Sequence, residues 1–204
     1  MNYYTSDLHL GHENIIAPMN RPYNNATEMD EDLVKRWNKK VKENDDVYII
    51  WDLSYKSVHQ IEYYLDRLAG HKHLIIGNHD EYWMKDVKDI QSYFDSVSHM
   101  ELIQEGERVL TLCHFPMFEW GGSRYIKDWK KSKTWMIHGH IHNSRECDAY
   151  KIIREKLFCE LNAGIDINNL EPVTFNELLE NNCKWYGRSE SYFVLGEPNN
   201  AENI

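Results

Sequence analysis

Five short apolar runs in this sequence each lead directly into polar side chains of the kinds that bind metal ions. Runs of this length, rich in β-branched and aromatic residues, are typical of buried strands. The polar segments that follow them are SDLH (Asp7, His9), WDLS (Asp52), GNHD (Asn78, His79), CHFP (His114) and HGHIH (His138, His140, His142). The repetition predicts a sheet-based fold in which the strand ends carry one polar site.

The rest of the pattern predicts a layered α/β domain. We expect strands at residues 2–6, 47–51, 73–76, 109–113, 135–137 and 158–161. Between the early strands, apolar stripes at helical spacing predict helices at residues 27–41 and 57–68, with Thr27 and Ser57 as N-caps. The spacing Thr174-x-x-Glu177 is that of a capping box at the start of a last helix.

Length and composition predict a single domain. The chain has 204 residues, of which 42% are hydrophobic and 27% are charged, which is enough for the core of one domain but not of two. We expect this domain at residues 1–196 and a disordered polar tail at residues 197–204. The segment at residues 119–132, with two glycines, aromatic residues and lysines, is expected to be a loop at the mouth of a site.

Charge and cysteine usage limit the partners and the compartment. The formal net charge is −10, which argues against long nucleic acids and anionic membranes as partners and leaves a small phosphoester or nucleotide as the expected substrate. The sequence lacks the basic, apolar and small-residue regions of a signal peptide, and it has no apolar stretch of membrane-spanning length. Its four cysteines form no C-x-x-C pair, which fits reduced thiols in a reducing compartment. We therefore expect a cytoplasmic protein.

The polar segments have the donor chemistry of a divalent metal site. Residues two apart in a strand point to the same face, so Asp7 with His9, and His140 with His142, are each expected to direct two ligands toward one point. Carboxylate, imidazole and amide oxygen suit manganese, iron or zinc better than an all-sulfur site does. Each pattern alone is weak, because single Asp-x-His pairs and single histidines are common. Chance explains all five together poorly.

In these motifs the chain resembles the calcineurin-like metallophosphoesterases, whose pattern is D-x-H, G-D, G-N-H-D/E, H and G-H-x-H. The match runs from Asp7 to His142. The segments DLHLGHENI and NRPYNN...EMDEDLVKRWN are similar to those of the compact single-domain members from bacteria and phages. The resemblance implies a four-layer α/β/β/α sandwich with the site at the strand ends.

The resemblance also implies a role for each matched residue. It implies that Asp7, His9 and His142 hold one metal ion, that Asn78, His114 and His140 hold a second, and that Asp52 bridges them. The two divalent ions would be manganese first, with iron, zinc or nickel as alternatives. The implied enzyme is a metal-dependent phosphoester hydrolase, a phosphodiesterase or a phosphatase, in which a metal-bridging hydroxide attacks phosphorus in line. His79 would assist departure of the leaving group.

Five further residues are candidates to contact substrate or to support a ligand: His12, Asp80, Arg21, Arg124 and His138. Each has a plain structural alternative. Asp80 could orient His79 or cap the next helix, the two arginines could bind phosphate or form surface ion pairs, and His12 could be a surface residue. For His138 we prefer a hydrogen-bonded core histidine. The aromatic residues Tyr23, Tyr55, Trp120 and Tyr125 could stack on a base or simply pack in loops.

The sequence departs from the family pattern at one position. Trp51 precedes Asp52 where the family has glycine. Either Trp51 keeps ordinary strand geometry with its ring turned away from the metals, or the bridging Asp52 is displaced. Neighbouring side chains in a strand point to opposite faces, so we expect the first outcome. On that expectation the site is preserved.

Two other functional classes remain open. One is a metallophosphoesterase-like fold with little or no catalysis that serves as a binding scaffold. The other is a protein whose ions only stabilise the fold. The presence of all seven expected ligands together with His79 favours the enzyme, because a purely structural site is normally closed and has no residue left over to donate a proton.

Overall fold

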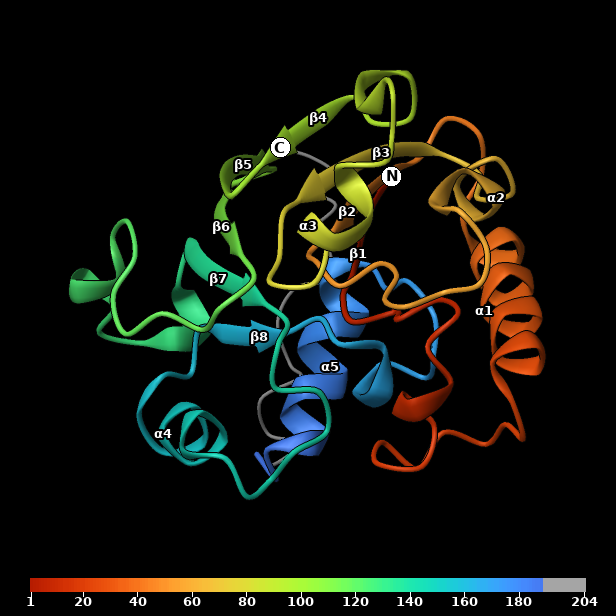
Figure 1. Cartoon of the computed structure of the whole chain (residues 1–204). Helices are drawn as coiled ribbons and strands as arrows, with labels where there is room; N and C mark the ends of the chain where they lie inside the picture. The colour runs from red at the N-terminus through yellow and green to blue at the C-terminus, as the bar shows by residue number, and fades with distance from the viewer. Residues whose placement is uncertain (189–204) are drawn as a thin grey trace, which may run out of the picture.

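The computed structural model describes residues 1–188 and contains two four-stranded sheets with helices around them (Figure 1). The polar tail expected at residues 197–204 lies outside the described residues, as does the end of the domain predicted at residues 1–196. Among residues 1–188, none of the helices combines the length and the apolar character needed to span a lipid bilayer.

The first sheet contains the strands that precede the first three motifs. Its order is β1 (Asn2–Thr5), β2 (Asp46–Ile49), β3 (His71–Ile75) and β4 (Ser96–Ser98), and all neighbours are parallel. Parallel neighbours need crossover connections, which here contain α1 (Ala26–Lys40) and α2 (Ile61–Leu65), and α3 (Glu81–Met84) follows β3. The segments that leave β1, β2 and β3 therefore emerge at the same edge of the sheet.

The second sheet contains the strands that precede the last two motifs. β5 (Met100–Glu105) pairs antiparallel with β6 (Arg108–Cys113), and β6, β7 (Thr134–His138) and β8 (Glu160–Asn162) are parallel. α4 (Asp148–Lys156) lies between β7 and β8 in the sequence, and α5 (Phe175–Trp185) follows β8. Short 3-10 helices lie at Glu13–Ile15, Ile90–Ser92, Ser123–Tyr125, Trp129–Lys131 and Ile165–Ile167.

Alternate residues of β1 face two different cores. Tyr3 belongs to the core that packs the first sheet against α1, and Tyr4 belongs to the core that joins the two sheets and α5. The first core includes Leu33, Trp37, Val47, Ile49 and Leu74, and the second includes Ile50, Ile75, Leu110, Leu112, Ile137, Leu161, Phe175 and Leu178. Because the second core contains side chains from both sheets, it fixes the motif-bearing edges relative to each other.

Most of the predicted elements are present. Each of the six expected strands is found, with ends that differ from the prediction by at most two residues. The capping box of Thr174 and Glu177 at the start of α5 is confirmed. The first long helix is confirmed too, but it begins at Ala26, with the Asn25 side chain accepting the N–H of Glu28, so Thr27 is not its N-cap.

The helix predicted at residues 57–68 is wrong in extent, because only α2 is helical there and its N-cap position is Gln60. Ser57 Oγ instead accepts the N–H of His59 and bonds the hydroxyl of Tyr64. A serine side chain that bonds nearby backbone in this way competes with helix formation. The strands β4 and β5 and the helix α4 were not predicted, and α3 was anticipated only as the helix that Asp80 could cap.

Candidate metal centre

The seven expected metal ligands lie after the strands, and most of them have an unusual backbone conformation. The angle φ is positive at Asp7 (56°), His9 (52°), Asp52 (51°), His140 (71°) and His142 (48°). This left-handed conformation is uncommon for residues other than glycine and clusters at functional sites. The prediction that strand alternation pairs these ligands is therefore wrong, since tight turns after β1 and β7 bring them together.

Three of these turns converge on Asp7. The N–H of Asp7 donates to the carbonyl of Trp51, and the N–H of His9 donates to the carbonyl of Asp52, both at 2.9 Å. From the second sheet, the N–H of His140 donates to both carboxylate oxygens of Asp7 at 3.1 Å. A Cβ at Gly139 would lie 2.7 Å from Asp7 Oδ2, so glycine is needed for this close approach.

The polar side chains form two groups that share Asp7. In the first ligand group, the donor atoms of Asp7, His9 and His142 all lie within 4.8 Å of one another. In the second ligand group, the same holds for Asp7, Asp52 and His114. Asp52 also lies close to the first group, because its Oδ2 is 3.6 Å from Nε2 of His9. The sequence thus identified residues that the fold does bring together.

His140 belongs to neither of these groups, and Asn78 lies between Gly77 and His79 after β3. The ring of His140 is 4.8 Å from that of His114, and both Asn78 and His140 are exposed. His79 lies beside the first ligand group, with its ring centroid 5.8 Å from that of His9. Its backbone N–H donates to Asp52 Oδ1 at 3.3 Å.

Burial shifts the protonation of the central side chains toward their neutral forms. Burial, with Asp7 and Asp80 nearby, raises the pKa of Asp52 to about 8. Burial, with repulsion from His140, lowers the pKa of His114 to about 2, and burial likewise lowers the pKa of His9. A neutral imidazole is the form that binds a metal. His142 differs from them: burial opposes its charged form, but Asp7 and Asp166 outweigh burial and raise its pKa.

Unpaired nitrogen atoms test whether this donor set fits metal ions. Nε2 of His9 and both ring nitrogens of His114 are buried, and none of them has a hydrogen-bond partner among the described residues. Buried polar atoms normally have partners, so such atoms need an explanation. A divalent cation bound by these nitrogens and by Asp7 and Asp52 would satisfy them and stabilise both carboxylates. The residues present fit the expected ions.

A buried ion pair supports the first ligand group. Arg21 donates to Asp166 through Nε at 2.7 Å and also to the carbonyl oxygens of Asp7 and Leu8 at 2.7 Å. Asp166 Oδ2 lies 2.9 Å from Nδ1 of His142. Burial opposes ionisation of Asp166, but the hydrogen bond to His142 and the charge of Arg21 outweigh it, so the pKa of Asp166 is lowered.

This arrangement corrects both alternatives for Arg21, which neither lies free to bind phosphate nor forms a surface ion pair. A carboxylate on Nδ1 of a histidine fixes the tautomer that leaves Nε2 available to a metal. Asp166 was missed in the sequence because it follows β8 outside every motif. Its signal was an aspartate just after an apolar strand, as at the other motifs.

Asp80 holds the backbone of the second ligand group. Its carboxylate accepts the N–H groups of Asp52 at 3.2 Å and Leu53 at 3.1 Å, and Nε1 of Trp83 at 2.8 Å. It occupies the N-cap position of α3 without a side-chain capping bond, and none of its side-chain bonds goes to His79. The N-cap position of Asp80 is therefore as predicted, but its carboxylate neither caps α3 nor bonds His79 among residues 1–188.

Trp51 does not have the predicted strand geometry. Its φ is +86°, and its ring makes an edge contact with His114, with the two centroids 3.9 Å apart. A Cβ at Gly77 would lie 1.1 Å from Cδ2 of the indole, so Gly77 provides the space for the ring. The prediction of a ring turned away from the site is wrong, although Asp52 still lies among the other ligands.

The remaining candidates lie in different places. His12 is beside the first ligand group, with Nδ1 3.3 Å from Nδ1 of His9. His138 is fully buried and its Nδ1 bonds the carbonyl of Gly139 at 2.8 Å, as a core histidine would. Arg124 is exposed and lies 3.9 Å from Glu119 in a surface ion pair. In the segment at residues 119–132, which contains Arg124, the side chains of Trp120, Ile126 and Trp129 pack against the second core.

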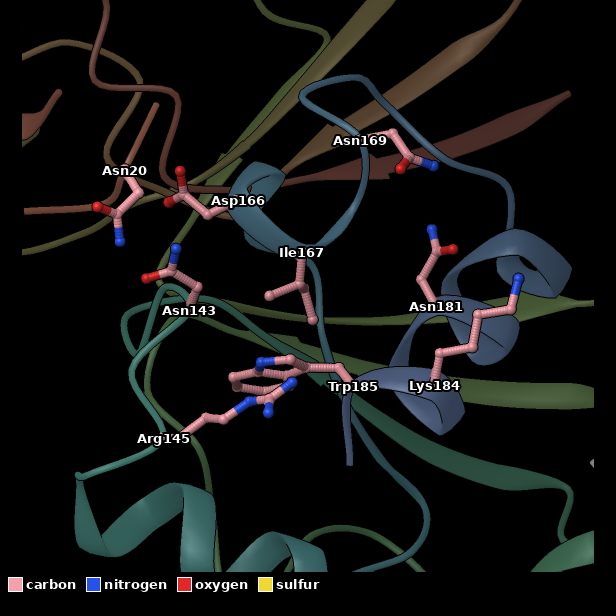
Figure 2. Close-up of a pocket in the computed structure, with 9 residues that line it drawn as sticks. All are labelled: Asn20, Asn143, Arg145, Asp166, Ile167, Asn169, Asn181, Lys184 and Trp185. Carbon is pink, nitrogen blue, oxygen red and sulfur yellow. The ribbon is translucent and has the colours of Figure 1, made fainter. Parts of the chain in front are cut away.

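A pocket of about 570 Å³ lies behind Asp166 (Figure 2). Figure 2 shows Asp166 at one side of it, opposite Lys184 and Asn181 of α5. The Asp166 carboxylate is already bonded to Arg21 and His142, and Lys184 pairs with Glu180 at 2.6 Å. This pocket therefore reaches a residue that supports a ligand but not the ligand atoms themselves.

Comparison with known proteins places the chain among relatives of similar length. No family model matches it. The uncharacterized protein MJ1445 of Methanocaldococcus jannaschii is 30% identical over 180 residues, which cover 87% of this chain and 89% of that protein. The chain belongs to the same family as that archaeal protein. The Gene 66 protein of Mycobacterium phage L5 is also 30% identical, over 69% of this chain and 77% of the phage protein.

A solved structure has a similar fold. The crystal structure of AQ665 from Aquifex aeolicus, a protein described as of unknown function, superposes with a TM-score of 0.60 and 26% identity. The match covers 85% of this chain and 94% of the Aquifex chain.

Proposed function

We propose that the chain is a calcineurin-like metallophosphoesterase, a phosphoester hydrolase that uses two divalent ions. In this proposal the two sheets and their helices form the four-layer α/β/β/α sandwich of that family. The observation that carries it is the pair of buried ligand groups that share Asp7, with unpaired imidazole nitrogens at His9 and His114. A site built only for stability would be closed, whereas His140, whose ring lies 4.8 Å from that of His114, is exposed.

The ligand assignment follows the motifs and differs from the observed groups, in which Asp7 is the shared residue. Asp7, His9 and His142 would hold one ion, Asn78, His114 and His140 the other, and Asp52 would be shared. When bound, the ions, manganese first with iron, zinc or nickel as alternatives, would neutralise the phosphoryl oxygens and lower the pKa of a water molecule.

The protein's own side chains supply orientation and a proton. Asp166 holds Nδ1 of His142 so that Nε2 faces the ligand group, and Asp80 fixes the backbone of Asp52. His79 lies beside the centre without belonging to either ligand group, so its ring is free to donate a proton to the departing oxygen. The substrate would be a small phosphoester or nucleotide rather than a long nucleic acid, given the net charge of −10.

We place this activity in the cytoplasm. All four cysteines are free thiols. Free thiols are the usual state in a reducing compartment.

The alternative is a scaffold with little or no catalysis. The feature that favours it is the contact of Trp51 with His114, because an indole against a ligand could restrict the second ligand group. The full ligand set and His79 favour the enzyme.

The test is hydrolysis of bis(p-nitrophenyl) phosphate and of p-nitrophenyl phosphate by metal-stripped protein reloaded with manganese. Bound metal is measured in parallel, and Asp52→Asn is the blank. We expect turnover that requires manganese and is absent from Asp52→Asn. His79→Ala should keep its metal and lose turnover of an ester with a poor alkoxide leaving group, while p-nitrophenolate, which departs without a proton, should be affected less. Two bound ions with no turnover of either ester would contradict the proposal and favour the scaffold.

A further inference from the structure

We propose that a pocket beside His79, formed around Tyr55 and Tyr82, binds the leaving group of the substrate, and that this leaving group is a nucleoside. The inference rests on the proposed hydrolase, and it names the substrate class of that site. The group that protonates the departing oxygen must contact the leaving group, so the leaving group would lie on the side of the metal centre where His79 is.

Aromatic rings continue outward from His79. The ring of Tyr55 lies 4.3 Å from the ring of His79 and 4.9 Å from that of His12, measured between centroids. Tyr82 of α3 makes an edge contact with Tyr55 at 5.6 Å and is 54% exposed. An exposed aromatic surface that begins at the leaving-group acid can stack on a planar base.

A pocket of about 440 Å³ lies along this surface. It is lined by residues 54–62 together with Tyr82, Trp83 and Asp86. Its volume falls within the range of small-molecule sites, roughly 300–1,000 Å³, so it suits one nucleoside and not a polymer. Val58 on its lining is 93% exposed, which places apolar surface at its entrance.

The polar groups of the pocket suit a sugar. Glu62 and Asp86 on its lining are carboxylates that can accept hydrogen bonds from hydroxyl groups. The ammonium of Lys56 lies 5.0 Å from the centre of the Tyr55 ring, between the aromatic surface and solvent, where it would attract a phosphoester in a chain of strongly negative net charge. Stacking rings, hydroxyl acceptors and one cation together match a nucleoside attached to phosphate.

The other aromatic candidates do not lie at this side of the site. The hydroxyl of Tyr23 donates to Asp32 at 2.7 Å, Trp120 packs against the second core, and Tyr125 is 77% exposed in the segment between β6 and β7. The larger pocket of Figure 2 adjoins Asp166, which is bonded to Arg21 and His142, and its lining does not include Tyr55, the residue whose ring contacts His79.

The test uses two substrates with the same leaving oxygen. Adenosine 5′-monophosphate and ribose 5-phosphate both lose a primary 5′ alcohol, but only the first carries a base; the methyl diester of each is assayed as well. In manganese-loaded protein we expect kcat/KM to be at least about tenfold higher for the adenosine esters, mainly through a lower KM. In Tyr55→Ala this preference should fall to about twofold or less, and Tyr55→Phe should keep it.

A second variant of the pocket and a matched control variant complete the test. Tyr82→Ala, an exposed change on α3, should reduce the preference about threefold even if Tyr55→Ala folds poorly. Tyr125→Ala, a matched exposed tyrosine far along the chain, should leave the preference unchanged.

The inference is overturned if p-nitrophenyl esters are hydrolysed but adenosine and ribose esters react equally, or if the preference survives both Tyr55→Ala and Tyr82→Ala. In either case the hydrolase proposal stands. Failure to hydrolyse any of these esters with two ions bound would instead overturn the hydrolase, and the leaving-group pocket with it.

Discussion

The two ligand groups differ in the buried carboxylate that lies behind each of them. Behind the first group, Asp166 is paired with the guanidinium of Arg21, and its pKa is lowered. Behind the second group, Asp80 accepts only N–H donors, and burial raises its pKa to about 7. The comparison teaches that one group is positioned by a charged pair and the other by backbone hydrogen bonds and by the indole of Trp51.

The largest expected effect is loss of the cation behind the first group. Arg21→Met leaves Asp166 buried without its partner, and breaking a buried ion pair costs roughly 3–5 kcal/mol. Urea unfolding of the metal-stripped protein measures this change. Arg36→Met is the control, because Arg36 pairs with Asp32 on the exposed face of α1 and should lose less than about 1 kcal/mol. Equal losses in the two variants would show that the buried pair does not hold the first group.

The next effect concerns the indole beside the second group. Gly77→Ala adds a methyl group where the Trp51 ring lies, and such overpacking costs typically 1–3 kcal/mol, so we expect a loss of roughly 3 kcal/mol in the free energy of unfolding. In a Trp51→Gly background the same change should cost less than about 1 kcal/mol, because the space is then free. The double-mutant cycle isolates this coupling. A cost that is independent of Trp51 would mean that the two residues are not packed together.

Sequence reasoning located six strands and the candidate ligands for one physical reason. Buried strands such as β2 are apolar runs, and the polar residues that follow them are local signals that need no knowledge of the fold. The contacts of the supporting residues were not readable in this way, although Arg21 and Asp80 were candidates and Asp166 follows an apolar strand. Arg21 and Asp166 meet across 145 positions, and Asp80 bonds backbone groups whose placement depends on the first sheet.

The same limit explains the error at Trp51. A strand pattern predicts extended geometry, but the turn that carries Asp52 requires φ near +86° at the preceding residue. A glycine would meet this requirement without strain, and strain at a non-glycine residue costs of order 1–3 kcal/mol. Gly77, which follows β3, provides the space for the ring of Trp51, which follows β2. A local sequence pattern cannot predict this contact between two separate segments.

A smaller effect is expected when the charge of Asp166 is removed but its shape is kept. Asp166→Asn weakens the hold on Nδ1 of His142, and changes of this kind typically reduce metal affinity about 10–100-fold. Competition with a chromogenic chelator measures manganese affinity directly and independently of turnover. Asp148→Asn, an exposed change at the start of α4, is the control and should leave affinity unchanged. Unaltered affinity in Asp166→Asn would show that the tautomer of His142 is set by other contacts.

The smallest effect is expected behind the second group, at the side-chain donor to Asp80. Trp83→Phe keeps an aromatic ring but removes one of the three N–H groups that Asp80 accepts, which should cost about 1 kcal/mol in the free energy of unfolding. Manganese affinity should change less than about threefold, because the N–H groups of Asp52 and Leu53 still fix the carboxylate. Chelator competition and urea unfolding are run on the same protein preparations as Asp166→Asn. If Trp83→Phe weakened metal binding as much as Asp166→Asn, the second group would depend on a single side-chain contact, and the contrast between the two groups would be wrong.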